Sequence, residues 1–121
     1  MDVEWLILAD AAQVTGGKLS LLGGGWNQVT ANKFPHPQSM SIAVSIAVPW
    51  IRTNEKHSFE IEIANADGET IKKLPGEFEV GRPAGLPPGQ DQRAQFAMNI
   101  NWTIDRPGGY VIIARLDGEE G

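Results

Sequence analysis

Apolar and polar residues alternate with a period of two along most of the chain. In residues 40–48 (MSIAVSIAV) the even positions are large and apolar, whereas the odd positions are serine or alanine. Residues 56–64, 94–104 and 109–116 show the same alternation, which is the spacing of β-strands with two different faces. Shorter strands are predicted at 3–9, 18–22, 26–30, 70–74 and 77–80. No window of eleven or more residues carries a helical stripe, so the pattern indicates an all-β protein.

Turn signals separate these segments. Residues 65–69 (NADGE) predict a hairpin turn, and residues 81–89 (GRPAGLPPG) form a proline-rich loop that could cross between sheets. Eight or nine short strands favour a single-domain antiparallel β-sandwich of about eight strands over residues 1–121, with immunoglobulin-like or jelly-roll-like topology. The turn at 105–110 (DRPGGY) resembles the turn and tyrosine that open a late strand in many immunoglobulin-like sandwiches.

Composition narrows the classes of function. The 121 residues include no cysteine, so disulfides and thiolate metal sites are excluded. The net charge of −5 argues against nucleic-acid binding, which needs lysine and arginine on the phosphates. Asp2 and Glu4 stand where a signal peptide would carry positive charge, and the apolar run after them is too short to span a membrane. We therefore expect a cytoplasmic protein without nucleic-acid or membrane partners.

Three consecutive glycines at 23–25 interrupt an apolar run just before Trp26. A dinucleotide-binding loop would need a helix after the glycines, but residues 26–32 (WNQVTAN) are β-branched and alternating. We interpret the triplet as a bulge or sharp bend that leaves room for the Trp26 ring. A backbone site for an anion is the alternative.

No arrangement of catalytic or metal-binding residues is evident. The two histidines, His36 and His57, belong to no zinc-binding motif, and no serine lies in a nucleophile elbow. Loop acids such as Asp117 lack the spacing of a calcium loop. We therefore predict no catalytic residue, no metal and no cofactor, and interpret both histidines as ordinary surface or turn residues.

Residues 37–51 contain no charge, and the second face of this strand, with Ser41 and Ser45, is small and flat. Either the chain itself covers this face, or the face packs on a second copy or another protein. The strand at 94–104 shares the feature, because Asn99 and Asn101 lie on a neutral amide face. These four residues are candidate contacts.

Two further candidates lie near proline residues. Arg82 is the charged side chain within the rigid loop at 80–90, which suits either recognition or a plain crossover. Trp50 follows Pro49 at a strand end. An exposed tryptophan beside amide side chains is typical of sugar-binding sandwiches, so Trp50 and the two asparagines are candidate sugar contacts.

Four segments in fixed order carry a resemblance that covers nearly the whole chain: LADAAQVTGGKLSLLGGGW, PHPQSMSIAVSIAVPW, VGRPAGLPPG and PGGYVIIARLDGE. They resemble an uncharacterised family of small bacterial proteins with LADxAQ, GKLxxLGGGW and GRPxGLPPG segments. The resemblance implies a bacterial all-β domain and no particular activity.

These observations favour a non-enzymatic protein-interaction or scaffolding domain that associates with itself or with another protein. The alternative is a small-ligand or carbohydrate-binding module that uses Trp50, Asn99 and Asn101. An enzyme would have to assemble scattered residues such as His36, His57 and Asp10, and no spacing in the chain supports that.

Overall fold

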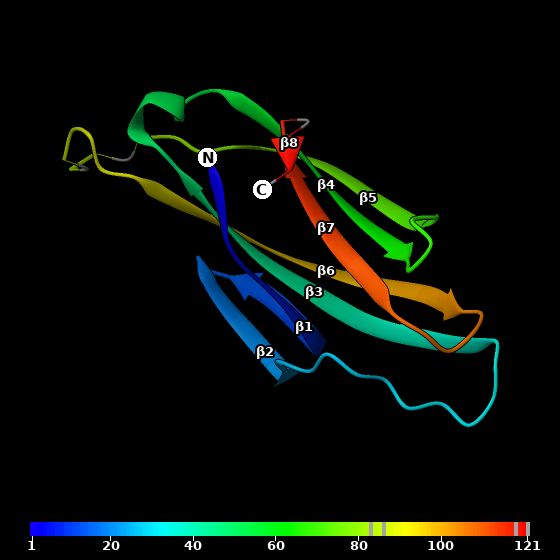
Figure 1. Ribbon diagram of the computed structural model, residues 1–121. Helices are drawn as coiled ribbons and strands as arrows, with labels where there is room; N and C mark the ends of the chain where they lie inside the picture. The colour runs from blue at the N-terminus through cyan, green and yellow to red at the C-terminus, as the bar shows by residue number, and fades with distance from the viewer. Residues whose placement is uncertain (83, 86, 118, 121) are drawn as a thin grey trace. The chain divides into compact units, whose positions relative to one another are not determined.

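Strands dominate the chain, as the alternation predicts (Figure 1). The computed structural model describes residues 1–82, 84–85, 87–117 and 119–120. The strands are β1 (Asp2–Thr15), β2 (Lys18–Gly24), β3 (His36–Val48), β4 (Lys56–Asn65), β5 (Thr70–Glu79), β6 (Gln92–Ile104), β7 (Tyr110–Leu116) and β8 (Glu119–Glu120). A 3-10 turn, η1 (Trp50–Arg52), follows β3.

The eight strands form two sheets of four, with the orders β2-β1-β3-β6 and β5-β4-β7-β8. The β1–β2, β4–β5, β4–β7 and β7–β8 pairs are antiparallel. The predicted all-β class, with about eight antiparallel strands in two sheets, is confirmed. With β2 set aside, the orders β1-β3-β6 and β5-β4-β7-β8 follow the A-B-E and C′-C-F-G orders of immunoglobulin-type sheets. Tyr110 opens β7, the strand at position F, as the DRPGGY turn predicts.

The chain also divides into two compact units that cut across the strands. One unit comprises Met1–Val3, Ile46–Ala94 and Gly108–Gly121, and the other comprises Glu4–Ser45 and Gln95–Pro107. In the first unit Ile61 and Ile63 of β4 are fully buried, and in the second unit Ile42 and Val44 of β3 are. Each unit therefore carries its own part of the apolar interior.

The predicted hairpin turn at 65–69 connects β4 to β5. The Asn65 side-chain oxygen accepts hydrogen bonds from the amides of Asp67 (3.0 Å) and Glu69 (2.9 Å). Gly68 takes a φ of 83° and donates to the Asn65 carbonyl at 3.0 Å. The asparagine thus closes the turn with its own side chain, as Asn and Asp do in tight reversals.

Three predicted strands differ from the structure. Residues 26–30 form no strand, because the chain leaves the edge strand β2 there and has no neighbouring strand to pair with. The separate strands predicted at 70–74 and 77–80 are one strand, β5, that passes through Pro75 and Gly76. A proline is tolerated there because β5 lies at a sheet edge, where one side of the strand needs no hydrogen-bond donor.

The triple glycine forms the predicted bend at the end of β2. Gly23 and Gly25 have φ values of 59° and 91°, a region that favours glycine, and the Gly25 amide donates to the Leu8 carbonyl at 2.8 Å. The prediction that the glycines make room for Trp26 is corrected, because a Cβ at Gly23 would overlap the Asp10 carboxylate. With an acidic side chain already there, the geometry gives no support to an anion site.

Candidate functional site

Two side-chain hydrogen bonds join β3 to the edge strand β6. The Ser41 hydroxyl donates to Asn99 Oδ1, and the Ser39 hydroxyl donates to Asn101 Oδ1 at 2.5 Å. The pairs run in opposite directions along the two strands, so β3 and β6 are antiparallel. The structure therefore brings three of the predicted contacts, Ser41, Asn99 and Asn101, into one ladder.

Ser41 and Ser45 lie inside the protein, with exposed fractions of 1% and 0%. Besides the bond from Ser41 to Asn99, the Ser45 hydroxyl donates to Glu4 Oε1 at 2.7 Å. Ala43 between them is also fully buried. These exposures fit the interpretation in which the chain itself covers the small face of this strand, and they leave neither serine available as a surface contact.

Asn99 and Asn101, in contrast, are exposed, and they lie on a strand at the end of its sheet. No residue from 94 to 104 is charged. Edge strands usually carry charges, prolines, bulges or short lengths that prevent pairing with another chain. This part of β6 is long for an edge segment and contains neither a charge nor a proline.

The other three sheet edges in the described part of the chain are shorter or carry such features over most of their length. β5 carries Pro75 at its centre together with Lys72 and Lys73. β2 is seven residues long and ends in glycines, with Gly23 at positive φ. β8 has two residues and pairs only with Arg115 and Leu116, so residues 110–114 of β7 also lie at this edge without a charge. The uncharged stretch of β6 is the longer of the two, with eleven residues against five.

The structure also brings Trp50 and Arg82 together, although 32 residues separate them in the chain. The Arg82 guanidinium lies 4.1 Å from the centre of the Trp50 ring, in the geometry of a cation–π contact. It donates to the Trp50 carbonyl (2.8 Å) and to the hydroxyl of Thr53 (2.5 Å). One face of the Trp50 ring is thus occupied by Arg82, which reduces the surface on which a sugar ring could stack.

The turn η1 and the Arg82 side chain that bonds to it form a corner of this unit, which has both exposed and buried residues. Ile51, between Trp50 and Arg52 in η1, is 78% exposed, whereas Thr53 is 3% exposed.

The predicted loop at 80–90 is described except for Pro83 and Leu86, which lie outside the described residues. Trp50 belongs to one unit and Asn99 and Asn101 to the other.

A histidine network beside this corner is not evident from the sequence. His57 is 2% exposed; its Nδ1 lies 2.9 Å from Asp117 Oδ2, and its Nε2 lies 2.7 Å from the Arg52 carbonyl. Asp117 also accepts bonds from the Ser58 amide (2.8 Å) and from Arg52 Nη2 (3.2 Å). The sequence could not reveal this network, because Asp117 follows His57 by 60 residues.

Opposing effects set the ionisation of Asp117. Burial favours the neutral acid, but the Ser58 amide, the His57 ring and the Arg52 guanidinium together hold the pKa of Asp117 below its usual value. A carboxylate oriented on a histidine is also found in catalytic triads. Here, however, Nε2 faces a backbone carbonyl and has no lone pair directed at a substrate, so the pair acts structurally.

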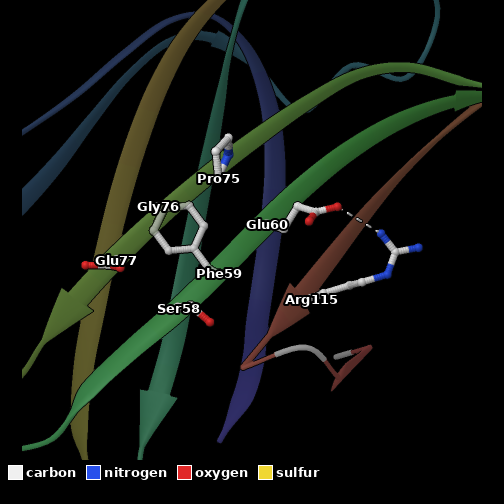
Figure 2. Close-up of a pocket in the computed structure, with 7 residues that line it drawn as sticks. All are labelled: Ser58, Phe59, Glu60, Pro75, Gly76, Glu77 and Arg115. Atoms are coloured by element: carbon white, nitrogen blue, oxygen red, sulfur yellow. Dashed lines mark hydrogen bonds and ion pairs between the residues drawn. The ribbon is translucent and has the colours of Figure 1, made fainter.

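A cavity of about 400 Å³ lies over β5, β4 and β7 (Figure 2). It is lined by Ser58, Phe59, Glu60, Pro75, Gly76, Glu77 and Arg115. The Arg115 guanidinium bonds to Glu62 at 2.7 Å and to Glu60 at 3.4 Å, and Figure 2 shows the second of these contacts. Because two carboxylates already hold Arg115, it is poorly placed to capture an anionic ligand.

Glu62, beside this cavity, is 7% exposed and is bonded across both neighbouring strands. The hydroxyl of Thr70 on β5 and the guanidinium of Arg115 on β7 hold the pKa of Glu62 below its usual value, against the opposing effect of burial. The carboxylate is therefore a structural link within the sheet.

No group of three or more His, Cys, Asp or Glu residues in the described part of the chain is arranged to hold a metal ion. Nor does any helix within the same residues have the length and apolar character needed to cross a membrane.

Residues 4–121 match the model of a family of unknown function (DUF6941). The chain belongs to this family. The match spans nearly the whole chain, which agrees with the predicted resemblance to an uncharacterised family. No curated protein and no solved structure matches the chain.

Proposed function

We propose that this protein is a non-enzymatic interaction domain that self-associates through the edge of β6. The observation that carries the proposal is the unprotected edge: a long strand at the end of its sheet with no charge from 94 to 104. Strand addition at such an edge is a common mode of protein association. A second copy is the occupant we favour, because a neutral strand meets its own copy without charge repulsion.

Symmetry defines the expected arrangement. Two identical strands that pair antiparallel are related by a two-fold axis, so the same residues contribute from both copies. Residue 99 is the midpoint of the uncharged stretch 94–104. With the axis at Asn99, Gln95 of one copy faces Thr103 of the other. Pairing over this stretch would add about ten backbone hydrogen bonds, roughly one per residue.

The cellular location and the class of partner that we propose are inferred from the composition of the chain. The absence of cysteine and the net charge of −5 support a cytoplasmic protein whose partners are proteins rather than nucleic acids or membranes. The segment resemblance supports a bacterial origin. Sugar binding stays an alternative prediction, and the contact between Arg82 and Trp50 weakens it.

The test is the mass in solution by light scattering, over a concentration series at about 0.15 M salt, where surface charges are moderately screened. Wild type should move toward twice the chain mass as concentration rises. Gln95→Lys with Thr103→Lys places lysines opposite each other in the pair and should leave a monomer. Gln95→Glu with Thr103→Lys places opposite charges there instead and should restore the dimer.

A matched control separates strand pairing from a change in total charge. Gln28→Lys with Thr30→Lys adds the same two charges at exposed positions outside β6 and should still dimerise. Circular dichroism checks that each variant is folded. A wild type that is monomeric at every concentration, or a double-lysine β6 variant that still dimerises, would show the proposal to be wrong.

A further inference from the structure

His57 stands in a hydrogen-bonding position that only one form of its ring can satisfy. Both ring nitrogens face oxygen atoms: Asp117 Oδ2 at 2.9 Å and the Arg52 carbonyl at 2.7 Å. A backbone carbonyl only accepts hydrogen bonds, and an ionised carboxylate does the same. Both nitrogens must therefore donate at once, and an imidazole has two N–H groups only when it is protonated.

The surrounding charges are consistent with a protonated ring. In the residues described for this unit, the groups around it are Asp117 after β7, Arg52 of η1 and Glu55 of the following turn. Arg52 bonds to Glu55 at 3.1 Å and to Asp117 at 3.2 Å, so two acids balance Arg52 and a cationic His57. From β5 the ring meets Phe78, which is uncharged, at 5.4 Å between ring centres.

The next residues along these strands do not face the ring. Lys56 and Glu79 are paired one position further along β4 and β5. Because side chains alternate along a strand, they lie on the opposite face from His57 and Phe78. The described charged groups beside the ring are therefore Asp117, Arg52 and Glu55, and Arg82 adds a further cation on the same turn.

We propose that His57 is a proton-dependent clamp on the Trp50–Arg52 turn. In the protonated ring, Nδ1–H bonds to Asp117 and Nε2–H bonds to the Arg52 carbonyl, which ties the turn to the end of β7. When the proton leaves, the negative charge of Asp117 retains the hydrogen on Nδ1. Nε2 then turns a lone pair toward the Arg52 carbonyl, and the clamp opens.

Opening the clamp would change the surface that the turn presents. The same turn carries Trp50 and the exposed Ile51, and it anchors Arg82 through the Trp50 carbonyl. Higher pH should therefore loosen this corner, and lower pH should tighten it. The inference does not depend on the proposed pairing of β6, which involves other residues.

The experiment is NMR of the ¹⁵N-labelled full chain between about pH 5 and 8, the range in which histidines ordinarily change charge. At low pH a slowly exchanging Nε2–H of His57 should be visible. The Thr53 amide, which donates to the Trp50 carbonyl at 3.2 Å, reports on the turn. Its protection, corrected for the intrinsic rate, should fall about fivefold as pH rises, the equivalent of one hydrogen bond.

Three variants make the test specific. His57→Gln should abolish the pH dependence, whereas His36→Gln, at the only other histidine of the chain, should keep it. Asp117→Asn should keep the bond from Nε2 to the Arg52 carbonyl at every pH, because the new amide side chain can accept from Ser58 and donate to Nδ1, so that a neutral ring keeps Nε2–H. Arg52 loses its bond to residue 117 in this variant but keeps its bond to Glu55. An unchanged pH dependence in Asp117→Asn or His57→Gln would overturn the proposal, as would a wild-type turn whose protection is constant.

Discussion

Phe59 and Gly76 show how one missing side chain shapes a strand pair. They lie opposite each other in the β4–β5 register, and a Cβ at Gly76 would overlap the Phe59 ring. The ring also lies 6.1 Å from Phe78, measured between ring centres. An aromatic ring over a strand glycine covers backbone that would otherwise be bare, so the glycine is required by the ring and not by its own φ.

Gly76→Ala should therefore destabilise the fold by on the order of 1–3 kcal/mol, the range for overpacking. Urea unfolding measures the loss. Gly109→Ala is the matched control, because nothing lies within 4 Å of a Cβ at that position, and it should stay within about 0.5 kcal/mol of wild type. In a Phe59→Ala background the Gly76→Ala penalty should shrink; equal penalties in both backgrounds would contradict this account.

The residues that sequence reasoning misses are joined by the fold across long separations. The sequence predicts an ordinary surface or turn position for His57, which is wrong, because the ring is 2% exposed. Its partners are a carboxylate 60 residues away and a backbone carbonyl. The sequence points to Trp50 and Arg82 separately, and their contact depends on how the loop after β5 returns to η1. A single sequence shows the residue types but not which of them meet.

At the scale of elements, Glu62 links the three strands β5, β4 and β7. Thr70→Val keeps the shape of the side chain but removes the hydroxyl that bonds to Glu62. The pKa of Glu62 should then rise toward its usual value, and the urea midpoint should fall at pH 7. Because the folded pKa is lowered, the stabilisation is full above the usual value of 4.5 and is lost as pH falls through the lower folded value.

The difference between wild type and Thr70→Val should therefore narrow as pH falls from 7 to below about 4. Urea midpoints at several pH values, with the Glu62 carboxyl followed by NMR, measure both effects. Thr30→Val, at an exposed position outside the strands, should change neither. A gap between the two curves that stays constant with pH would mean that Thr70 acts through packing alone.

Most strands could be predicted from alternation, because a period of two needs only local sequence. The predicted strand limits are wrong where pairing with neighbouring strands, and not the local sequence, determines the strand. Pro75 and Gly76 predict a break in β5, but an edge strand accommodates both. Residues 26–30 have a strand pattern and no strand to pair with. The exposure of Asn99 and the burial of Ser41 likewise follow from strand order, which the alternation does not encode.

For the whole molecule, the net negative charge of each copy disfavours association through the proposed interface. Each copy carries a formal net charge of −5, whereas residues 94–104 carry none. Two copies that pair through β6 therefore repel at long range and meet no charge at the contact itself. Salt screens such repulsion, since the Debye length falls from about 10 Å at 0.1 M to about 3 Å at 1 M.

Self-association should therefore strengthen with salt. We expect the dimer dissociation constant, measured by sedimentation equilibrium, to fall several-fold as salt rises from about 0.05 to 0.5 M. The Gln28→Lys with Thr30→Lys variant has a net charge of −3 (−5 plus 2), so it should dimerise more tightly than wild type at low salt and equally at high salt. An interface built on ion pairs would behave in the opposite way, and weakening by salt would place the contact elsewhere than β6.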